Sequence, residues 1–104
     1  YYPVFQATVE RPFLEFFADR PEEFERAASK LGAERIDLGD LAFRIPVLPR
    51  VQSVFILYRG DEELPPSAKV LFDSSVRDYL TVELVRIVSE EAVMRLIELA
   101  KEGG

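Results

Sequence analysis

Hydrophobic and polar positions follow two different periods along the chain. They predict a strand at the start, two helices after it, further strands in the middle and a helix towards the C-terminal end. Short runs of β-branched and aromatic residues are typical of strands. The run over 51–59 includes five consecutive apolar residues, Val54 to Tyr58, which indicates a central strand buried on both faces. The predicted strands are residues 2–9, 34–37, 41–47, 51–59 and 69–73.

Apolar residues at helical spacing predict three helices. Residues 13–18 follow Pro12 and place three phenylalanines on one face. Residues 21–31 begin with a proline and several glutamates, which is typical of a helix N-terminus. Residues 81–102 carry the longest apolar stripe, and Ser89 before two glutamates leaves open a break into two helices. We favour one helix.

The order of these elements predicts an α+β fold, in which two or three helices pack on a mostly antiparallel sheet of four to five strands. The 104 residues fit a single domain, 1–104. The chain starts with Tyr1-Tyr2-Pro3 and has no initiator methionine, so we expect it to be the C-terminal part of a longer protein.

Composition and charge reduce the number of function classes that the chain can belong to. The chain has no histidine, cysteine or tryptophan, so the usual neutral-pH base, thiolate metal sites and disulfides are missing from it. The net charge of −6 argues against a nucleic-acid binder and against an anionic membrane surface. We expect a cytoplasmic protein with no cofactor in this chain. The arginine-rich, asparagine-free composition fits a thermophile or a GC-rich genome.

Candidate chemistry gathers in the loop over 60–67, where three carboxylates precede a double proline. Carboxylate oxygens suit Mg²⁺ or Ca²⁺, although the loop lacks the spacing of a calcium-binding loop, and a solvated acidic loop is the commoner case. We therefore predict no metal. The ligand-binding candidates are Asp40, Arg50, Asp61, Glu62, Glu63 and Asp73.

Each of these candidates also has a plain structural explanation. Asp73 and the two serines after it could form a site at a strand end, or could provide turn and cap hydrogen bonds. Arg44, Arg50 and Arg59 could bind an anionic ligand. Alternatively, they could pair with loop carboxylates and fix the loops, the expected partners being Asp37, Asp40, Asp61 or Glu63. Asp40, Asp61 and Asp73 could also converge for acid–base catalysis, which requires them to be close together.

Several segments resemble a known family. These segments are Leu48-Pro49-Arg50-Val51, Gly60-Asp61-Glu62-Glu63-Leu64-Pro65-Pro66 and Leu71-Phe72-Asp73. On these residues the chain resembles the C-terminal part of the domain of unknown function 3786 family. The similarity extends from about Phe13 to the last helix. The resemblance implies a protein of anaerobic bacteria or archaea, some of whose relatives carry a cysteine-rich iron–sulfur segment beside this domain. The resemblance does not assign a biochemical activity to this chain.

Three functions remain open, and the first is favoured. In the first, the chain is a non-enzymatic binding or accessory module that packs through an apolar patch against a protein partner or a missing N-terminal segment. Alternatively, it is a small ligand-binding or enzymatic domain with a carboxylate and arginine pocket around the 60–67 loop. The third possibility is a homodimer formed through an exposed sheet edge.

Overall fold

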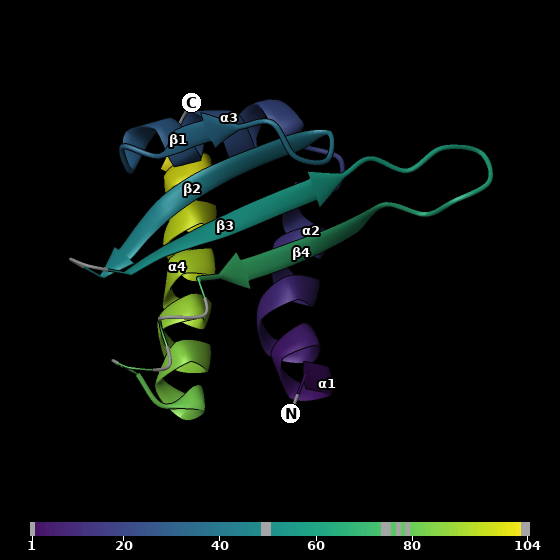
Figure 1. Ribbon diagram of the computed structural model, residues 1–104. Coiled ribbons are helices and arrows are strands. Elements are labelled where there is room, and N and C mark those ends of the chain that lie inside the picture. Colours follow the sequence, from purple (N-terminus) through teal and green to yellow (C-terminus); the bar gives the residue numbers. More distant parts are fainter. Residues whose placement is uncertain (1, 49–50, 74–75, 77, 79, 103–104) are drawn as a thin grey trace.

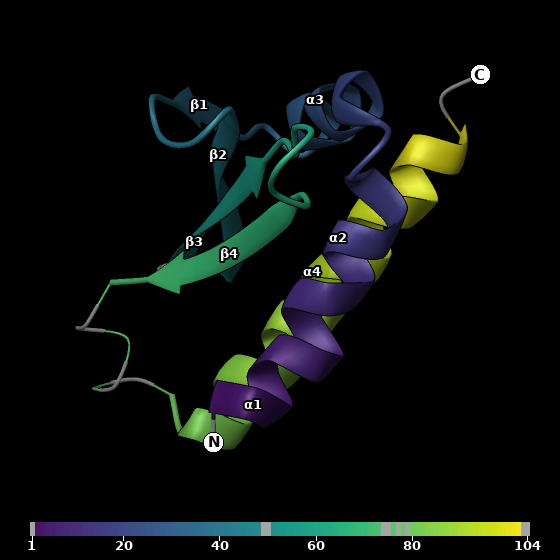
Figure 2. The ribbon, with the colours of Figure 1, turned by 90° about the vertical axis from the view of Figure 1, so that its right-hand side faces the viewer.

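The computed structural model describes residues 2–48, 51–73, 76, 78 and 80–102. One sheet forms a layer, and the helices pack against one of its faces (Figures 1 and 2). The α+β fold with an antiparallel sheet is thus confirmed.

The sheet contains four strands in their order along the chain. These are β1 (Glu34–Ile36), β2 (Leu41–Leu48), β3 (Val51–Tyr58) and β4 (Ser67–Phe72), and each pairs antiparallel with the next. The strands predicted over 34–37, 41–47, 51–59 and 69–73 therefore exist, and β3 lies inside the sheet as its apolar run indicated. The expected burial of β3 on both faces holds only in part, because the helices cover one face and Tyr58 on the other is 37% exposed.

The predicted strand over 2–9 is wrong, because this segment is helical. It comprises α1 (Tyr2–Phe5), a π-helical turn η1 (Gln6–Glu10) and α2 (Arg11–Phe17), which continue one another with helical backbone angles at each junction. The predicted helix over 13–18 is the end of this longer one. The β-branched and aromatic residues fit a strand locally, but tertiary packing overrides such preferences.

The π-helical turn has a cause in the sequence. Pro12 has no N–H to donate and its ring crowds the preceding turn, which ordinarily kinks or breaks a helix. Here the backbone N–H of Arg11 bonds the carbonyl of Gln6, five residues back, so the chain widens by one residue just before the proline. The helix passes Pro12 without ending.

The two other helices match the prediction closely. α3 (Pro21–Lys30) starts at a proline and ends before Gly32, which has a φ of +74°. α4 (Val82–Glu102) is a single helix, capped by Thr81, whose Oγ1 accepts a hydrogen bond from the Leu84 N–H at 3.2 Å. α1, η1 and α2 run beside α4 in the same direction (Figure 2).

Phenylalanines form the centre of the core between the helices and the sheet. Phe13 contacts Phe24 and Phe55 with ring centroids 5.0 and 5.4 Å apart in edge-on geometry, and Phe24 meets Phe43 at 5.2 Å. These rings come from α2, α3, β3 and β2, so α2 and α3 are fixed to the sheet through the same cluster. All four side chains are at most 3% exposed.

Candidate functional site

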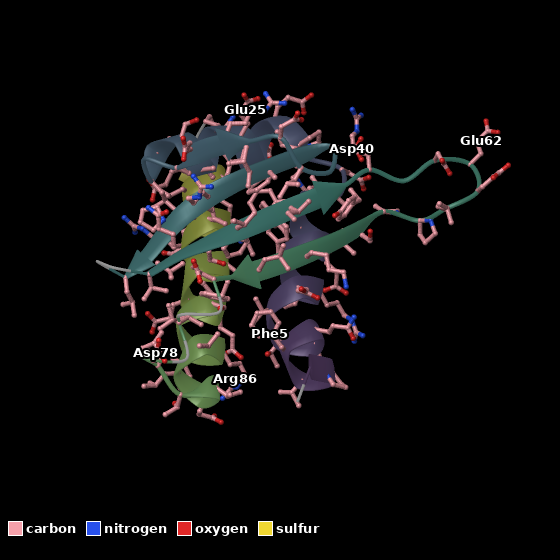
Figure 3. The ribbon with its side chains drawn as sticks, in the orientation of Figure 1. Phe5, Glu25, Asp40, Glu62, Asp78 and Arg86 are labelled. Atoms are coloured by element: carbon pink, nitrogen blue, oxygen red, sulfur yellow. The ribbon has the colours of Figure 1, made fainter. Side chains whose placement is uncertain are left out.

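The acidic loop forms an arm that extends beyond the sheet between β3 and β4 (Figure 1). Glu62 lies at its far end, away from the body of the molecule (Figure 3). Gly60 permits the narrow base of the arm, because a Cβ there would lie 2.6 Å from the backbone nitrogen of Pro66. The loop over 60–67 therefore has a fixed shape at its base and an exposed tip.

Asp61 organises the tip through its own backbone and carboxylate. Its N–H donates to the carbonyl of Leu64 at 2.8 Å, and its Oδ1 accepts from the N–H groups of Glu63 and Leu64 at 2.8 and 2.7 Å. The hydrogen bond from the Leu64 N–H, followed by that from Glu63, lowers the pKa of the Asp61 carboxyl. Asp61 is thus an acceptor within the turn.

Asp40 fixes the other side of the arm's base. Its Oδ2 accepts a hydrogen bond from the backbone N–H of Arg59 at 2.7 Å, and its own N–H donates to the carbonyl of Leu57 at 3.2 Å. Asp40 precedes β2 and Arg59 follows β3, so these bonds tie together the two chain segments at this end of the sheet. The Asp40 carboxylate therefore holds the backbone at Arg59 in place.

A pocket of about 360 Å³ lies where the base of the arm meets the turn between α2 and α3. It is lined by Ala18, Asp19, Pro21, Arg59, Gly60, Asp61 and Pro66. Two aspartates and one arginine are therefore among the residues that line this pocket. Of the predicted ligand-binding residues that the structure describes, only Asp61 lines it.

The remaining candidates are dispersed. Asp73 follows β4 at the end opposite the arm, and the six residues of β4 at ~3.3 Å each place it roughly 20 Å along the strand from the loop. Asp73 therefore does not converge with Asp61. Glu62 and Glu63 are exposed on the arm. Arg50, together with Ser74 and Ser75, lies outside the described residues.

Two arginines, one in the sheet and one in α4, illustrate pairing with glutamates. Arg44 of β2 binds Glu34 of β1, which lies directly opposite in the register of the sheet. Arg44 thus pairs with a carboxylate, but the predicted partner is wrong, because Glu34 is a strand residue and not one of the loop carboxylates. In α4, Arg86 binds both Glu83 and Glu90, and these hydrogen bonds raise its pKa.

A second pocket, of about 460 Å³, forms a groove between α4, the end of β2 and the end of α3. Hereafter the α4 groove means this pocket. Its apolar walls include Leu31, Pro46, Val47, Leu48, Val88, Ala92 and Met94. Charged residues of α4 are also part of its lining, namely Glu91, Arg95 and Glu98.

Sequence reasoning missed the α4 groove. Apolar residues of α4 outside the buried stripe were a partial signal, because Leu84, Ile87 and Met94 are spaced by three and seven residues and so share one face. Of these three, Met94 lines the groove and the other two do not. These side chains are 44%, 39% and 62% exposed. The strand half of the groove had no such signal, since it depends on how β2 lies against α4.

Metal-ligand clusters and membrane-spanning helices are two features absent from the part of the chain that the structure describes. There, no group of three or more acidic, histidine or cysteine side chains is arranged to hold a metal ion. No described helix combines the length and the apolar character needed to cross a membrane.

The fold and the pockets described above define a small two-layer α+β domain with a mostly apolar groove on its longest helix. The chain belongs to the family described as a domain of unknown function (DUF3786), whose model matches residues 1–95. The family resemblance is confirmed, but its extent is corrected, because the match starts at the first residue and not near Phe13. No curated protein and no solved structure matches the chain.

Proposed function

We propose that this chain is a non-enzymatic protein-binding module that docks a partner protein in the α4 groove. The observation that carries the proposal is the exposure of Met94, at 62%, beside an apolar concavity of about 460 Å³. Clustered exposed apolar surface with charged residues at its edge is typical of protein-interaction sites. Methionine side chains suit such surfaces because they adapt their shape to a partner.

The placement of the polar candidates also favours binding over catalysis. The carboxylates of Asp40 and Asp61 accept hydrogen bonds from backbone N–H groups, and Asp73 lies at the other end of β4. A general acid and base must both reach the same reacting group. The partner surface that fits the groove is an apolar segment with charged residues on either side, because the groove has apolar walls and carries charges of both signs.

Site-specific photo-cross-linking tests this proposal. A photoreactive residue at Met94 is expected to capture one protein, identified by mass spectrometry, in cells of the source organism. The matched control carries the same residue at Leu71, which is 47% exposed on the opposite face of the sheet. The purified captured protein should bind the wild-type chain, and Ala92→Arg should weaken binding by filling the groove. Equal capture at both positions, or no binding by the purified pair, overturns the proposal.

The pocket at the base of the arm supports a second candidate function, the binding of a small ligand. Arg59 offers a cationic group, and Asp19 and Asp61 offer anionic ones, around a volume of about 360 Å³. A ligand that binds only the folded state raises the melting temperature. Thermal-shift measurements with Mg²⁺, Ca²⁺ and inorganic phosphate therefore test it, with Arg59→Ala as the variant that should abolish any shift caused by phosphate.

A further inference from the structure

Two oppositely charged residues beside the α4 groove are left available for a partner. Glu91 and Arg95 are exposed and lie about one helical turn apart on α4. Neither forms an ion pair with any residue that the structure describes, whereas Arg86 of the same helix binds two glutamates. The charged residues around Arg86 thus form ion pairs within α4, whereas Glu91 and Arg95 beside the groove do not.

The spacing of these residues is self-complementary. If two α4 helices pack antiparallel with a two-fold axis at the level of Val93, Glu91 of each copy faces Arg95 of the other copy. Met94 of each copy then faces Ala92 of the other, where the small side chain leaves room in the groove for the longer one. Two-fold contacts repeat every favourable pair, so one such arrangement gives two ion pairs and two apolar contacts.

We propose that the occupant of the α4 groove is a second copy of this chain, in a two-fold dimer with antiparallel α4 helices and reciprocal Glu91–Arg95 ion pairs. This inference rests on the proposed function, because it names the partner for the same groove. Charge complementarity selects the occupant: the patch offers both an acid and a base at the spacing that an identical patch requires. A one-signed partner would leave one of the two charges without a counterpart.

The dimer is independent of the sheet edges. β4 lies at one edge and η1 packs beside it, while β1 at the other edge has only three residues. Short strands and covered edges resist strand pairing between molecules. The α4 groove therefore offers a self-association route that does not require a new strand pair.

A charge-swap series in sedimentation velocity tests the inference on the full chain. The wild type should dimerise increasingly with concentration between roughly 10 μM and 1 mM, the range expected of a small interface. Glu91→Arg and Arg95→Glu should each weaken dimerisation about tenfold, because each places two like-charge pairs across the axis. The double variant should restore it. Glu15→Arg, with the same charge change on α2, should match the wild type.

Each outcome of the sedimentation experiment either supports or overturns the proposed dimer. A wild type that stays monomeric, a double variant that fails to restore the dimer, or single variants that dimerise as well as Glu15→Arg would overturn the dimer. Circular dichroism confirms that each variant is folded. A monomer whose position 94 still captures a different protein would overturn only this inference and leave the proposed function standing. A monomer that captures nothing would overturn both.

Discussion

Glu10 accepts a hydrogen bond from the backbone N–H of Val70, with 2.8 Å between Oε2 and the nitrogen. The glutamate belongs to the π-helical turn and is only 5% exposed, and Val70 belongs to the edge strand β4. Unpaired N–H groups on a sheet edge are templates for pairing with another chain. The bond satisfies one of them, so association through β4 would first have to displace Glu10.

Removing this acceptor should destabilise the fold. Glu10→Ala leaves the Val70 N–H buried without its partner, which costs about 1–3 kcal/mol. Glu10→Gln keeps an acceptor oxygen and should cost less. Urea unfolding measures both losses, and the exposed Glu15→Ala on the same helical segment should change stability by less than about 0.5 kcal/mol. Equal effects at positions 10 and 15 would contradict the role of this bond.

The turn at the tip of the arm should loosen at acid pH. Hydrogen bonds from Leu64 and Glu63 favour the ionised Asp61, so its pKa in the folded chain lies below the ordinary 3.8. Their contribution to stability is therefore complete above about pH 3.8 and is lost as the pH falls through the lowered value. An NMR titration of the Asp61 carboxyl measures this pKa, and a value at or above 3.8 would refute the prediction.

Variants at the same residue separate the carboxylate's charge from its geometry. Asp61→Ala should speed amide hydrogen exchange at Glu63 and Leu64, because it removes the acceptor for both N–H groups. Asp61→Asn retains an acceptor oxygen and should exchange nearly as slowly as the wild type. Glu62→Ala is the control on the same loop. Unchanged exchange in Asp61→Ala would show that the turn does not depend on this side chain.

Two glycines with positive φ should differ in their tolerance of alanine. Gly32 and Gly39 have φ values of +74° and +58°, so a Cβ costs about 1–2 kcal/mol at either position. At Gly39 the added Cβ would also lie 2.6 Å from Cγ2 of the buried Ile56, whereas at Gly32 it would meet nothing within 4 Å. Gly39→Ala should therefore destabilise the chain by about 1–3 kcal/mol more than Gly32→Ala in urea unfolding. Equal losses would contradict the close packing of this turn on the sheet.

Ser89 should behave as an interior helix residue. Its Oγ donates to the carbonyl of Val85 at 2.7 Å within α4, and the residue is fully buried. Because alanine is the better helix former, Ser89→Ala should leave stability unchanged or raise it by up to about 0.5 kcal/mol. Thermal unfolding measures the change. A loss of about 1 kcal/mol, as expected for a removed N-cap, would indicate that a helix starts there.

The sequence predicts the sheet and the two later helices because their signals are local. Pro21 marks a helix start, Gly32 follows its end, and the apolar run of β3 identifies an inner strand. The N-terminal segment misleads because Phe5 and Val9 occur in a β-rich composition. Their four-residue spacing continues through Phe13 and Phe17, and all four side chains are buried, so the helical period was present.

The candidate site was less predictable, because it depends on where the elements lie relative to one another. The loop at 60–67 could be found from its composition, but the use of Asp40 and Asp61 as backbone acceptors could not. Their separation from Asp73 follows from the direction of β4. The α4 groove is lined by segments about 40 residues apart in the chain, such as those of Leu48 and Val88, and no local pattern reports that they lie together.

Docking in the α4 groove is the central claim, and backbone NMR tests it most directly. The isotope-labelled chain is titrated with the protein captured at position 94, or is concentrated alone if that protein is a second copy. The account predicts that amide shifts change together at Leu31, along the end of β2 up to Leu48, and on α4 from Val88 to Glu98. Shifts confined to the arm around Asp61, or to the open face of the sheet at Leu71, would contradict it.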